Sequence, residues 1–384
     1  MKLGRRLALA IAVLSVLAGR HADRLRAQSA ASTFVYVTNY GANSVSAYAL
    51  DDSTGMLTEV RGSPFATGIQ PAGVAVDRSN RFLYVANNFF GSAGNLSAYA
   101  IDGTTGALTP LQGSPFQTAI ELPHGLATEP SGRFLYVTNY TGSTEVYAID
   151  ATTGELAAIA GSPFSGTSGS YSFPSVDPSG RFLFDTASTS PPEAQGLVFV
   201  SSIDPASGAL TPVPGSPFLA GRFTIGVGAD ASSRFVYAAN KWSGDISAFT
   251  LDATTGGLTP VSGSPFPVTA IPASISVHPS GRFLYVSKVG FGSGISAYMI
   301  DGATGALTLV PGSETATPAN NWQGTLDPSG RFYFAVNNFY PNIAHSVSAF
   351  TVDLTTGLLT EAPGSPFNTG TDPYSLAVAQ VARP

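Results

Sequence analysis

Short runs of alternating apolar and polar residues, separated by turn-forming residues, fill the chain from about residue 31 to its end. One of these runs, FVYVTN at 34–39, returns six more times as a closely related segment. Taken with the residue before each run, the seven copies start at 33, 81, 133, 181, 234, 282 and 331, which are 48 to 53 residues apart. A β-rich repeat of this length, without sustained 3.6-residue periodicity, predicts a β-propeller and not a helical solenoid.

Each repeat contains the same four apolar runs. A first run such as 73–76 leads through a DPSG-type turn into the aromatic run, and a third run such as 96–101 follows. A turn with Asp and Gly four residues apart then leads into a fourth run that ends in GSPF, as at 258–266. Turns of these types join neighbouring antiparallel strands, so each repeat is expected to form a four-stranded meander.

The two ends of the repeated region complement each other. The first copy lacks its first strand, and the chain ends with a single unmatched apolar run at 374–379. We therefore predict an all-β fold: one seven-bladed β-propeller over residues 31–384, closed by the C-terminal strand, which completes the N-terminal blade.

The N-terminus has the pattern of a signal peptide. Lys2, Arg5 and Arg6 precede an eleven-residue apolar run at 7–17, which is too short to span a bilayer comfortably. Residues 1–30 are interpreted as signal peptide and leader, with cleavage after Ala18 or near 27–29 left open, as is the alternative of a cytosolic protein with an apolar leader. The predicted location is extracytoplasmic, either periplasmic or secreted.

Charge and composition narrow the function classes. Removing residues 1–27 takes away six basic residues and one acidic residue, which changes the formal net charge from −6 to −11. So acidic a chain disfavours a nucleic-acid partner. The absence of cysteine excludes disulfides, thiolate metal sites and a cysteine nucleophile. No later run is long enough for a transmembrane segment, and we expect a monomer.

The repeated YVTN and YVAN strands and the DPSGRFLYV hairpin resemble those of the lactonase-type seven-bladed propellers, over about residues 31–380. This group includes proteins similar to 6-phosphogluconolactonase and to muconate cyclase, and YVTN-repeat surface proteins. The resemblance implies that a Pro-His segment ahead of the hairpin contributes to the site, and Pro123-His124 matches it. The second histidine often found two residues on is Leu126 here, and Ser274, Ser276 and 320–322 stand where active members place Glu and Arg.

Acidic and basic residues that recur at one repeat position are best explained by the scaffold. Five carboxylates precede an arginine by four residues, and we expect them to form surface ion pairs across the turn: Asp77, Glu129, Asp177, Asp230 and Asp327. His278 occupies the same position before Arg282, so a structural role is expected for it as well.

Departures from the repeat gather in the loops after the second and fourth strands, which an antiparallel meander places on one face of the ring. Together with His124 they form the predicted binding site: Glu121, Tyr171, Arg222, Lys241, Trp242, Lys288, Asn321 and Trp322. A mouth with aromatic and a few polar side chains suits a ligand, although the same residues would also serve to plug the channel. Asp185 replaces the valine of the other repeats inside a strand, which suggests a functional carboxylate, an ion pair between blades or a shifted register.

Two functions remain open after these observations. The first is an exported lactonase-like propeller that binds a small ligand, glycan or protein at the loop face. The alternative is a lactone hydrolase with His124 as general acid or base and Lys241, Lys288 or Arg222 stabilising the oxyanion. Whether the chain is an enzyme is left open. No cofactor is expected, although a calcium or magnesium ion held by Asn and Asp oxygens in the channel stays as an alternative.

Overall fold

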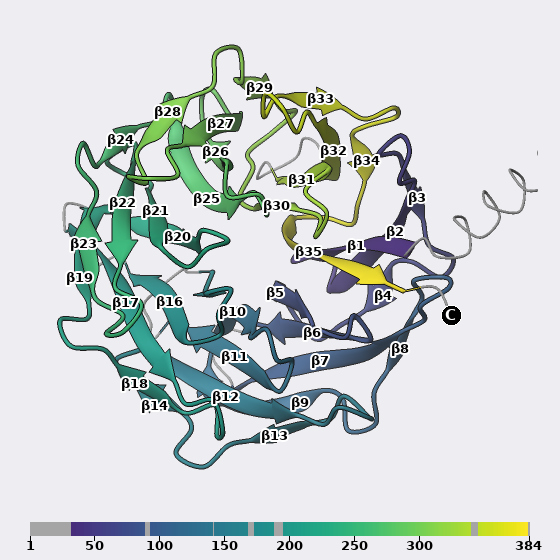
Figure 1. The fold of residues 1–384 in the computed structure, drawn as a ribbon. Coiled ribbons are helices and arrows are strands. Elements are labelled where there is room, and N and C mark those ends of the chain that lie inside the picture. Colours follow the sequence, from purple (N-terminus) through teal and green to yellow (C-terminus); the bar gives the residue numbers. More distant parts are fainter. Residues whose placement is uncertain are drawn as a thin grey trace, which may run out of the picture.

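The computed structural model describes residues 32–88, 93–140, 142–167, 173–187, 195–338 and 345–382. In this part of the chain, seven antiparallel sheets stand around a central axis like the blades of a propeller (Figure 1). The predicted all-β, seven-bladed architecture is confirmed. The predicted signal peptide and leader, residues 1–30, lie outside the described residues.

The two inner strands of each blade surround the axis. The innermost strands are β5 (Pro71–Val76), β10 (Pro123–Thr128), β15 (Ser175–Val176), β20 (Thr224–Ala229), β25 (Ile271–Val277), β30 (Gly324–Leu326) and β35 (Pro373–Val381). The second strands are the aromatic runs: β1 (Ser32–Asn39), β6 (Phe82–Asn87), β11 (Phe134–Asn139), β16 (Phe182–Ala187), β21 (Phe235–Asn240), β26 (Phe283–Val289) and β31 (Phe332–Asn337).

The outer half of each blade contains the third strand and a divided fourth strand. The third strands are β2 (Ser44–Leu50), β7 (Ala93–Ile101), β12 (Ser143–Ile149), β17 (Gln195–Ile203), β22 (Asp245–Leu251), β27 (Gly294–Ile300) and β32 (Ser346–Val352). Two short segments pair with each third strand. The earlier segments are β3 (Leu57–Glu59), β8 (Leu108–Pro110), β13 (Leu156–Ala158), β18 (Leu210–Pro212), β23 (Leu258–Pro260), β28 (Leu307–Leu309) and β33 (Leu359–Glu361). The later segments are β4 (Phe65–Ala66), β9 (Phe116–Glu121), β14 (Phe164–Ser165), β19 (Phe218–Arg222), β24 (Phe266–Pro267), β29 (Thr315–Ala316) and β34 (Phe367–Asn368).

Blade 1 is assembled from both ends of the chain. Its innermost strand is β35, which pairs antiparallel with β1 so that Phe34 lies opposite Ala379 and Tyr36 opposite Ala377. Blades 2 to 7 follow in chain order and begin with β5, β10, β15, β20, β25 and β30. The predicted closure of the ring by the C-terminal strand is therefore confirmed.

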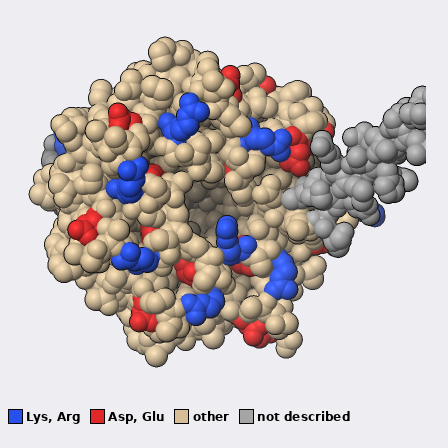
Figure 2. Space-filling view, in the orientation of Figure 1, with Lys and Arg blue, Asp and Glu red and all other residues tan. Residues whose placement is uncertain are grey.

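The ring has two unlike faces. The turn face holds the hairpin turns that follow each first and third strand, such as 77–81 and 102–106. The loop face holds the connections that follow each second strand and lead into each first strand, such as those around Asn87 and His124. Figure 2 looks onto the turn face and shows basic side chains arranged around a central hollow.

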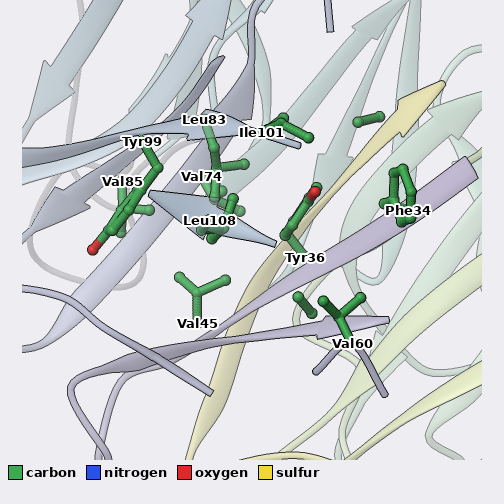
Figure 3. Packing of buried hydrophobic residues seen from close by; sticks show 12 residues of the cluster. Phe34, Tyr36, Val45, Val60, Val74, Leu83, Val85, Tyr99, Ile101 and Leu108 are labelled. Carbon is green, nitrogen blue, oxygen red and sulfur yellow. The ribbon is translucent and has the colours of Figure 1, made fainter. Parts of the chain in front are cut away.

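Each seam between neighbouring blades has its own cluster of buried apolar side chains. Between blades 1 and 2, Phe34, Tyr36 and Val45 meet Leu83 and Tyr99 (Figure 3). Burying such side chains contributes about 1.5–3 kcal/mol for each one. The seven seams together therefore hold the ring as one unit.

The turn with Asp and Gly four apart is part of the seam. Gly106 has φ +75°, and an added Cβ would lie 2.3 Å from the ring of Phe34 in the preceding blade. The hydroxyl of Tyr36 donates to the carbonyl oxygen of Gly106 at 3.0 Å. Only glycine combines this backbone conformation with so close a contact, which explains why the sequence repeats it.

The expectation of ion pairs across the DPSG-type turns is wrong. Asp177 accepts hydrogen bonds from the backbone N–H groups of Arg181 (2.7 Å) and Phe182 (2.8 Å), so its carboxylate closes the turn. The guanidinium of Arg181 stacks 5.2 Å from the ring centroid of Phe182. Among the described residues, the only ion pairs are Lys288–Glu314 and Arg331–Asp52. His278 has the expected structural role, because it is buried and bonded through both ring nitrogens to Ser280 and to the Gly330 carbonyl oxygen.

Candidate functional site

The loop face brings residues of different blades together through a repeated backbone feature. Gln70, Leu122, Phe223 and Asp372, each just before an innermost strand, have φ between 52° and 54°. In this left-handed conformation the Asp372 carbonyl oxygen accepts from the Tyr40 N–H at 2.8 Å, and that of Phe223 accepts from the Lys241 N–H at 2.9 Å. Non-glycine residues hold such a conformation at a cost of about 1–3 kcal/mol. The strain fixes each inner-strand start against the loop of its own blade.

His124 lies in an aromatic cluster on the loop face. It is the second residue of β10 in blade 3, and it is only 2 % exposed. Its Nε2 lies 2.8 Å from the Tyr374 hydroxyl of blade 1. Its ring lies 4.9 Å from that of Tyr140 and 5.4 Å from that of Phe173, between ring centroids. Tyr374 is half-buried and belongs to the blade next but one to that of His124, so the pair reaches solvent through the tyrosine.

This arrangement forms a hydrogen-bonded pair that can move a proton. A histidine and a phenol 2.8 Å apart are within hydrogen-bond reach, so either group can donate to the other according to the tautomer of His124. Tyr40 extends the cluster, with its ring centroid 5.7 Å from that of Tyr374. His124 therefore has a polar partner at the distance that general acid–base chemistry requires.

Lys241 lies in a second cluster on the same face. Its Nζ is 4.4 Å from the ring centroid of Trp322 in blade 7 and 5.4 Å from that of Phe223 in blade 5. Beneath it, Ile225, Ala273 and Val289 form a buried apolar floor against which Phe223 and Trp322 pack. Burial lowers the pKa of the Lys241 ammonium. No carboxylate of the described residues pairs with this amine, so its charge is available to an incoming anion or oxyanion.

Lys288 has a different environment from Lys241. It is 3 % exposed, and its Nζ contacts the Glu314 carboxylate and the Thr269 hydroxyl. Burial alone would raise the pKa of Glu314, but hydrogen bonds from Lys288, Ser296 and Thr269 outweigh it and hold that pKa below its usual value. Lys288 stands where five other second strands end in asparagine, and Glu314 stands where the other repeats have the proline of GSPF. The two departures compensate each other, which gives Lys288 a structural partner.

Asn321 is buried and is held between Thr317 and Asn337. Trp242 is 52 % exposed and meets the Phe223 ring edge-on at 5.8 Å. Arg222 and Glu121 are exposed at the ends of β19 and β9. The structure thus brings Lys241, Trp242 and Trp322 together around Phe223, while Asn321 and Lys288 are engaged in the scaffold.

Asp185 is fully buried in β16, and its Oδ1 accepts from the Thr186 N–H at 2.7 Å. The pairing of β16 with β17 runs without a break from Phe182 to Ala187, so the interpretation as a register shift is wrong. Tyr171, the remaining predicted site residue, lies outside the described residues.

Sequence patterns alone did not pair His124 with Tyr374, Tyr140 and Phe173. Tyr374 departs from the repeat at the start of a first strand, as His124 does, and that shared repeat position is the signal that identifies it. The contact between them requires the ring to close, because 250 residues separate the two in sequence.

The described residues contain no cluster of three or more His, Asp or Glu side chains suited to a metal ion. They also contain no helix with the length and apolar character that crossing a membrane requires.

The chain is similar to known proteins at two levels. The family model described as lactonase, 7-bladed beta-propeller, matches residues 24–120 and 262–370, more than half of the chain. None of the curated proteins compared with the sequence matches it.

Solved structures share the fold at low identity. A protein of Bacteroides uniformis described as a candidate 6-phosphogluconolactonase is 19% identical, with a TM-score of 0.75 over 91% of this chain and 99% of that one. The periplasmic gluconolactonase of Pseudomonas aeruginosa is 21% identical, with a TM-score of 0.74 over 91% and 99% of the two chains. At these identities the structures establish the common ring of blades.

Proposed function

This chain belongs to the lactonase family of seven-bladed β-propellers, and we propose that it hydrolyses a lactone at the loop face, next to the His124–Tyr374 pair. The observation behind this proposal is the 2.8 Å hydrogen bond between His124 Nε2 and the Tyr374 hydroxyl, which links blades 3 and 1. Family membership and neighbours that include a gluconolactonase support a lactone as the substrate class.

The protein must assist lactone hydrolysis in three ways. Water must lose a proton as it adds to the ring carbonyl, the oxyanion must be stabilised, and the ring oxygen must gain a proton as it leaves. Tyr374 is half-buried and is the member of the pair that an incoming substrate touches. His124 acts through it, taking the phenol proton or returning it, and so is a positioning residue in this scheme.

Lys241 is the group of the loop face best suited to meet negative charge. Its ammonium has no carboxylate partner among the described residues, in contrast to Lys288, which Glu314 neutralises. One amine between two aromatic rings suits a neutral lactone whose carbonyl becomes charged during the reaction. A phosphorylated lactone calls for several convergent cations, so an uncharged sugar lactone is the substrate we propose.

The test is a panel of unphosphorylated and phosphorylated aldonolactones, followed by acid release above the spontaneous rate. We expect saturable hydrolysis by the wild-type protein and a fall in kcat of about 100-fold for Tyr374→Phe. His124→Gln should lower kcat and remove one limb of the pH–rate profile, because a purely structural role would leave the shape of that profile unchanged. His278→Asp is the matched control, since it introduces the residue of four other turns on the opposite face.

A protein without saturable hydrolysis on any lactone would overturn this proposal. That result would favour the second candidate, in which the same mouth binds a small ligand or glycan without turning it over. The exposed face of Trp242 beside Phe223 favours this candidate, because aromatic faces stack against sugar rings. Calorimetric titration with oligosaccharides, and its loss in Trp242→Ala, would support binding without catalysis.

Export forms a separate part of the proposal. The basic and apolar pattern of residues 2–17 supports removal of a signal peptide and an extracytoplasmic address. N-terminal sequencing of the protein recovered from a periplasmic fraction or the medium tests it. An intact Met1 in a cytosolic fraction would contradict it.

A further inference from the structure

The opposite end of the channel, on the turn face, contains a cavity that the lactonase proposal does not use. Its volume is about 610 Å³, and Arg78, Asn80, Thr128 and Gln380 contribute polar groups to its lining. A second cavity of about 450 Å³ shares Val76, Thr128 and Val378 with it and continues along the innermost strands. Volumes of this size are those of small-molecule sites.

Arg78 and Asn80 are both departures from the repeat. The turn Asp77–Asn80 reads DRSN, whereas in four other turns the equivalents of Arg78 are Pro130, Pro178, Pro279 and Pro328; in blade 5 it is Ala231. The equivalents of Asn80 are glycines at 132, 180, 281 and 330, and Asn80 adopts their left-handed conformation with φ 57°. The turn keeps its backbone bond from the Asn80 N–H to the Asp77 carbonyl oxygen at 2.9 Å. The Arg78 and Asn80 side chains therefore change the polar groups that line the cavity, while the backbone of the turn stays the same as in the other repeats.

The Arg78 guanidinium makes no hydrogen bond or ion pair with the described residues, although the Cβ of Arg78 packs closely over Gly132 of blade 3. The carboxylates nearby are engaged elsewhere. Asp77 accepts from the N–H groups of Arg81 and Phe82, and Glu129 accepts from those of Ser131 and Arg133. An anion entering the cavity meets a free guanidinium and carboxylates that already accept hydrogen bonds from their own turns.

The cavity lining carries both charges, the Arg78 guanidinium and the carboxylates of Asp77 and Glu129. Both carboxylates accept hydrogen bonds from their own turns, so among these three groups Arg78 is the one without a partner in the described residues. Figure 2 shows basic side chains around the central hollow of the turn face. Asn80 and Gln380 add side-chain amides beside the guanidinium. The Asn80 Oδ1 accepts from the Gln380 backbone N–H at 3.1 Å and keeps a second lone pair for a hydroxyl group.

We propose that this cavity is a second binding site, for a small polyhydroxylated carboxylate, with Arg78 pairing with the carboxylate and Asn80 and Gln380 contacting hydroxyl groups. Guanidinium and carboxylate groups match in a planar, bidentate geometry that adds both affinity and orientation. The site is independent of the proposed hydrolysis, because its residues lie on the other face from His124 and Tyr374.

Calorimetric titration of the folded protein with sodium gluconate tests the site, and sorbitol serves as the uncharged ligand of matched size. The Lys241→Met background removes the unpaired amine of the loop face, so that the titration reports on the turn face. We expect saturable gluconate binding, with sorbitol at least tenfold weaker. Arg78→Pro should weaken gluconate by at least about tenfold.

Arg78→Pro is designed to keep the fold, because four other turns have proline there and no hydrogen bond from the Arg78 N–H is found in the described residues. Its thermal unfolding should match that of the parent, and its lactone hydrolysis should be unchanged. Equal affinity for gluconate and sorbitol, unchanged affinity in Arg78→Pro, or no saturable heat would each overturn the proposal. None of these results bears on hydrolysis at the loop face, so the two proposals can fail separately.

Discussion

The two faces of the ring share the same strands but use their side chains in opposite ways. On the turn face, Asp177 closes its own turn and is buried there, and Asp77, Glu129, Asp230 and Asp327 do the same. On the loop face, His124 and Lys241 contact residues two blades away. The repeated carboxylates are thus bonded within the scaffold, whereas the unrepeated His124 and Lys241 contact other blades.

Two lysines on the loop face refine this contrast. Lys288 departs from the repeat yet is neutralised by Glu314, a second departure in the same blade. Lys241 is flanked by aromatic rings and has no carboxylate partner among the described residues. A departure from the repeat is therefore not sufficient evidence for a functional group, because a second departure can compensate it structurally.

The largest effect is expected on the turn face. Asp177→Ala should lower the free energy of unfolding by about 3–5 kcal/mol, because it leaves one buried and three part-buried donors without their acceptor. Asp204→Ala is the control, since Asp204 closes an exposed turn through the Ala206 and Ser207 N–H groups and should cost clearly less. Urea denaturation measures both, and equal losses would show that burial of the turn carboxylate is unimportant.

The next effect concerns the compensated lysine. Glu314→Ala should cost about 2 kcal/mol, because it leaves the buried Lys288 ammonium unpaired; the value is modest since Glu314 itself is 42% exposed. The double variant Lys288→Met/Glu314→Ala should recover most of this loss. A double variant as unstable as Glu314→Ala alone would contradict the interpretation of the two residues as a compensating pair.

A smaller effect is expected from pH. The pKa of Glu314 is held below its usual value in the folded protein, so its contribution to stability is present above the unfolded pKa, about 4.3, and is lost as pH falls through the folded pKa. The difference in melting temperature between wild type and the Lys288→Met/Glu314→Ala variant should therefore narrow below about pH 4. A constant difference down to pH 3 would show that this carboxylate does not titrate with folding.

The smallest expected effect is spectroscopic. The chain has two tryptophans, so Trp242→Phe leaves Trp322 as the single one, with the Lys241 ammonium 4.4 Å from its ring centroid. Because burial lowers the pKa of Lys241, Trp322 fluorescence excited at the red edge should titrate with a midpoint below 10.5. Lys241→Met should abolish the transition. A transition that persists in Lys241→Met would place its origin elsewhere.

The ring of seven blades was predictable because seven copies of one pattern repeat the same information, although the division of each fourth strand was not. The unmatched apolar run at 374–379 also predicted where the ring closes, which the structure shows as the pairing of β35 with β1. The ion pairs expected across the DPSG-type turns were wrong, because sequence spacing does not show that backbone N–H groups compete for the same carboxylate. The Asp177 carboxylate accepts from the backbone N–H groups because they lie in the turn itself. The Arg181 guanidinium stacks instead on the ring of Phe182.

The candidate site was predictable in part. The face and most of its residues follow from subtracting the repeat, but the pairing of His124 with Tyr374 depends on how ring closure aligns two blades 250 residues apart. The partner of Lys288 was also hidden, because Glu314 lies in a different run of its blade. A role for Arg78 could not be predicted, because the sequence does not show the cavity that its side chain lines.

The seam in blade 1 sets an order of events for a chain that is made N-terminus first. Strand β1 is among the first to be synthesised, but its partner β35 begins only at Pro373. At about 5–20 residues per second, β1 waits roughly 20–70 seconds for that partner. During this time its inner edge is an open template for any other strand. Until β35 arrives, wrong pairing at this edge competes with the closure of the ring.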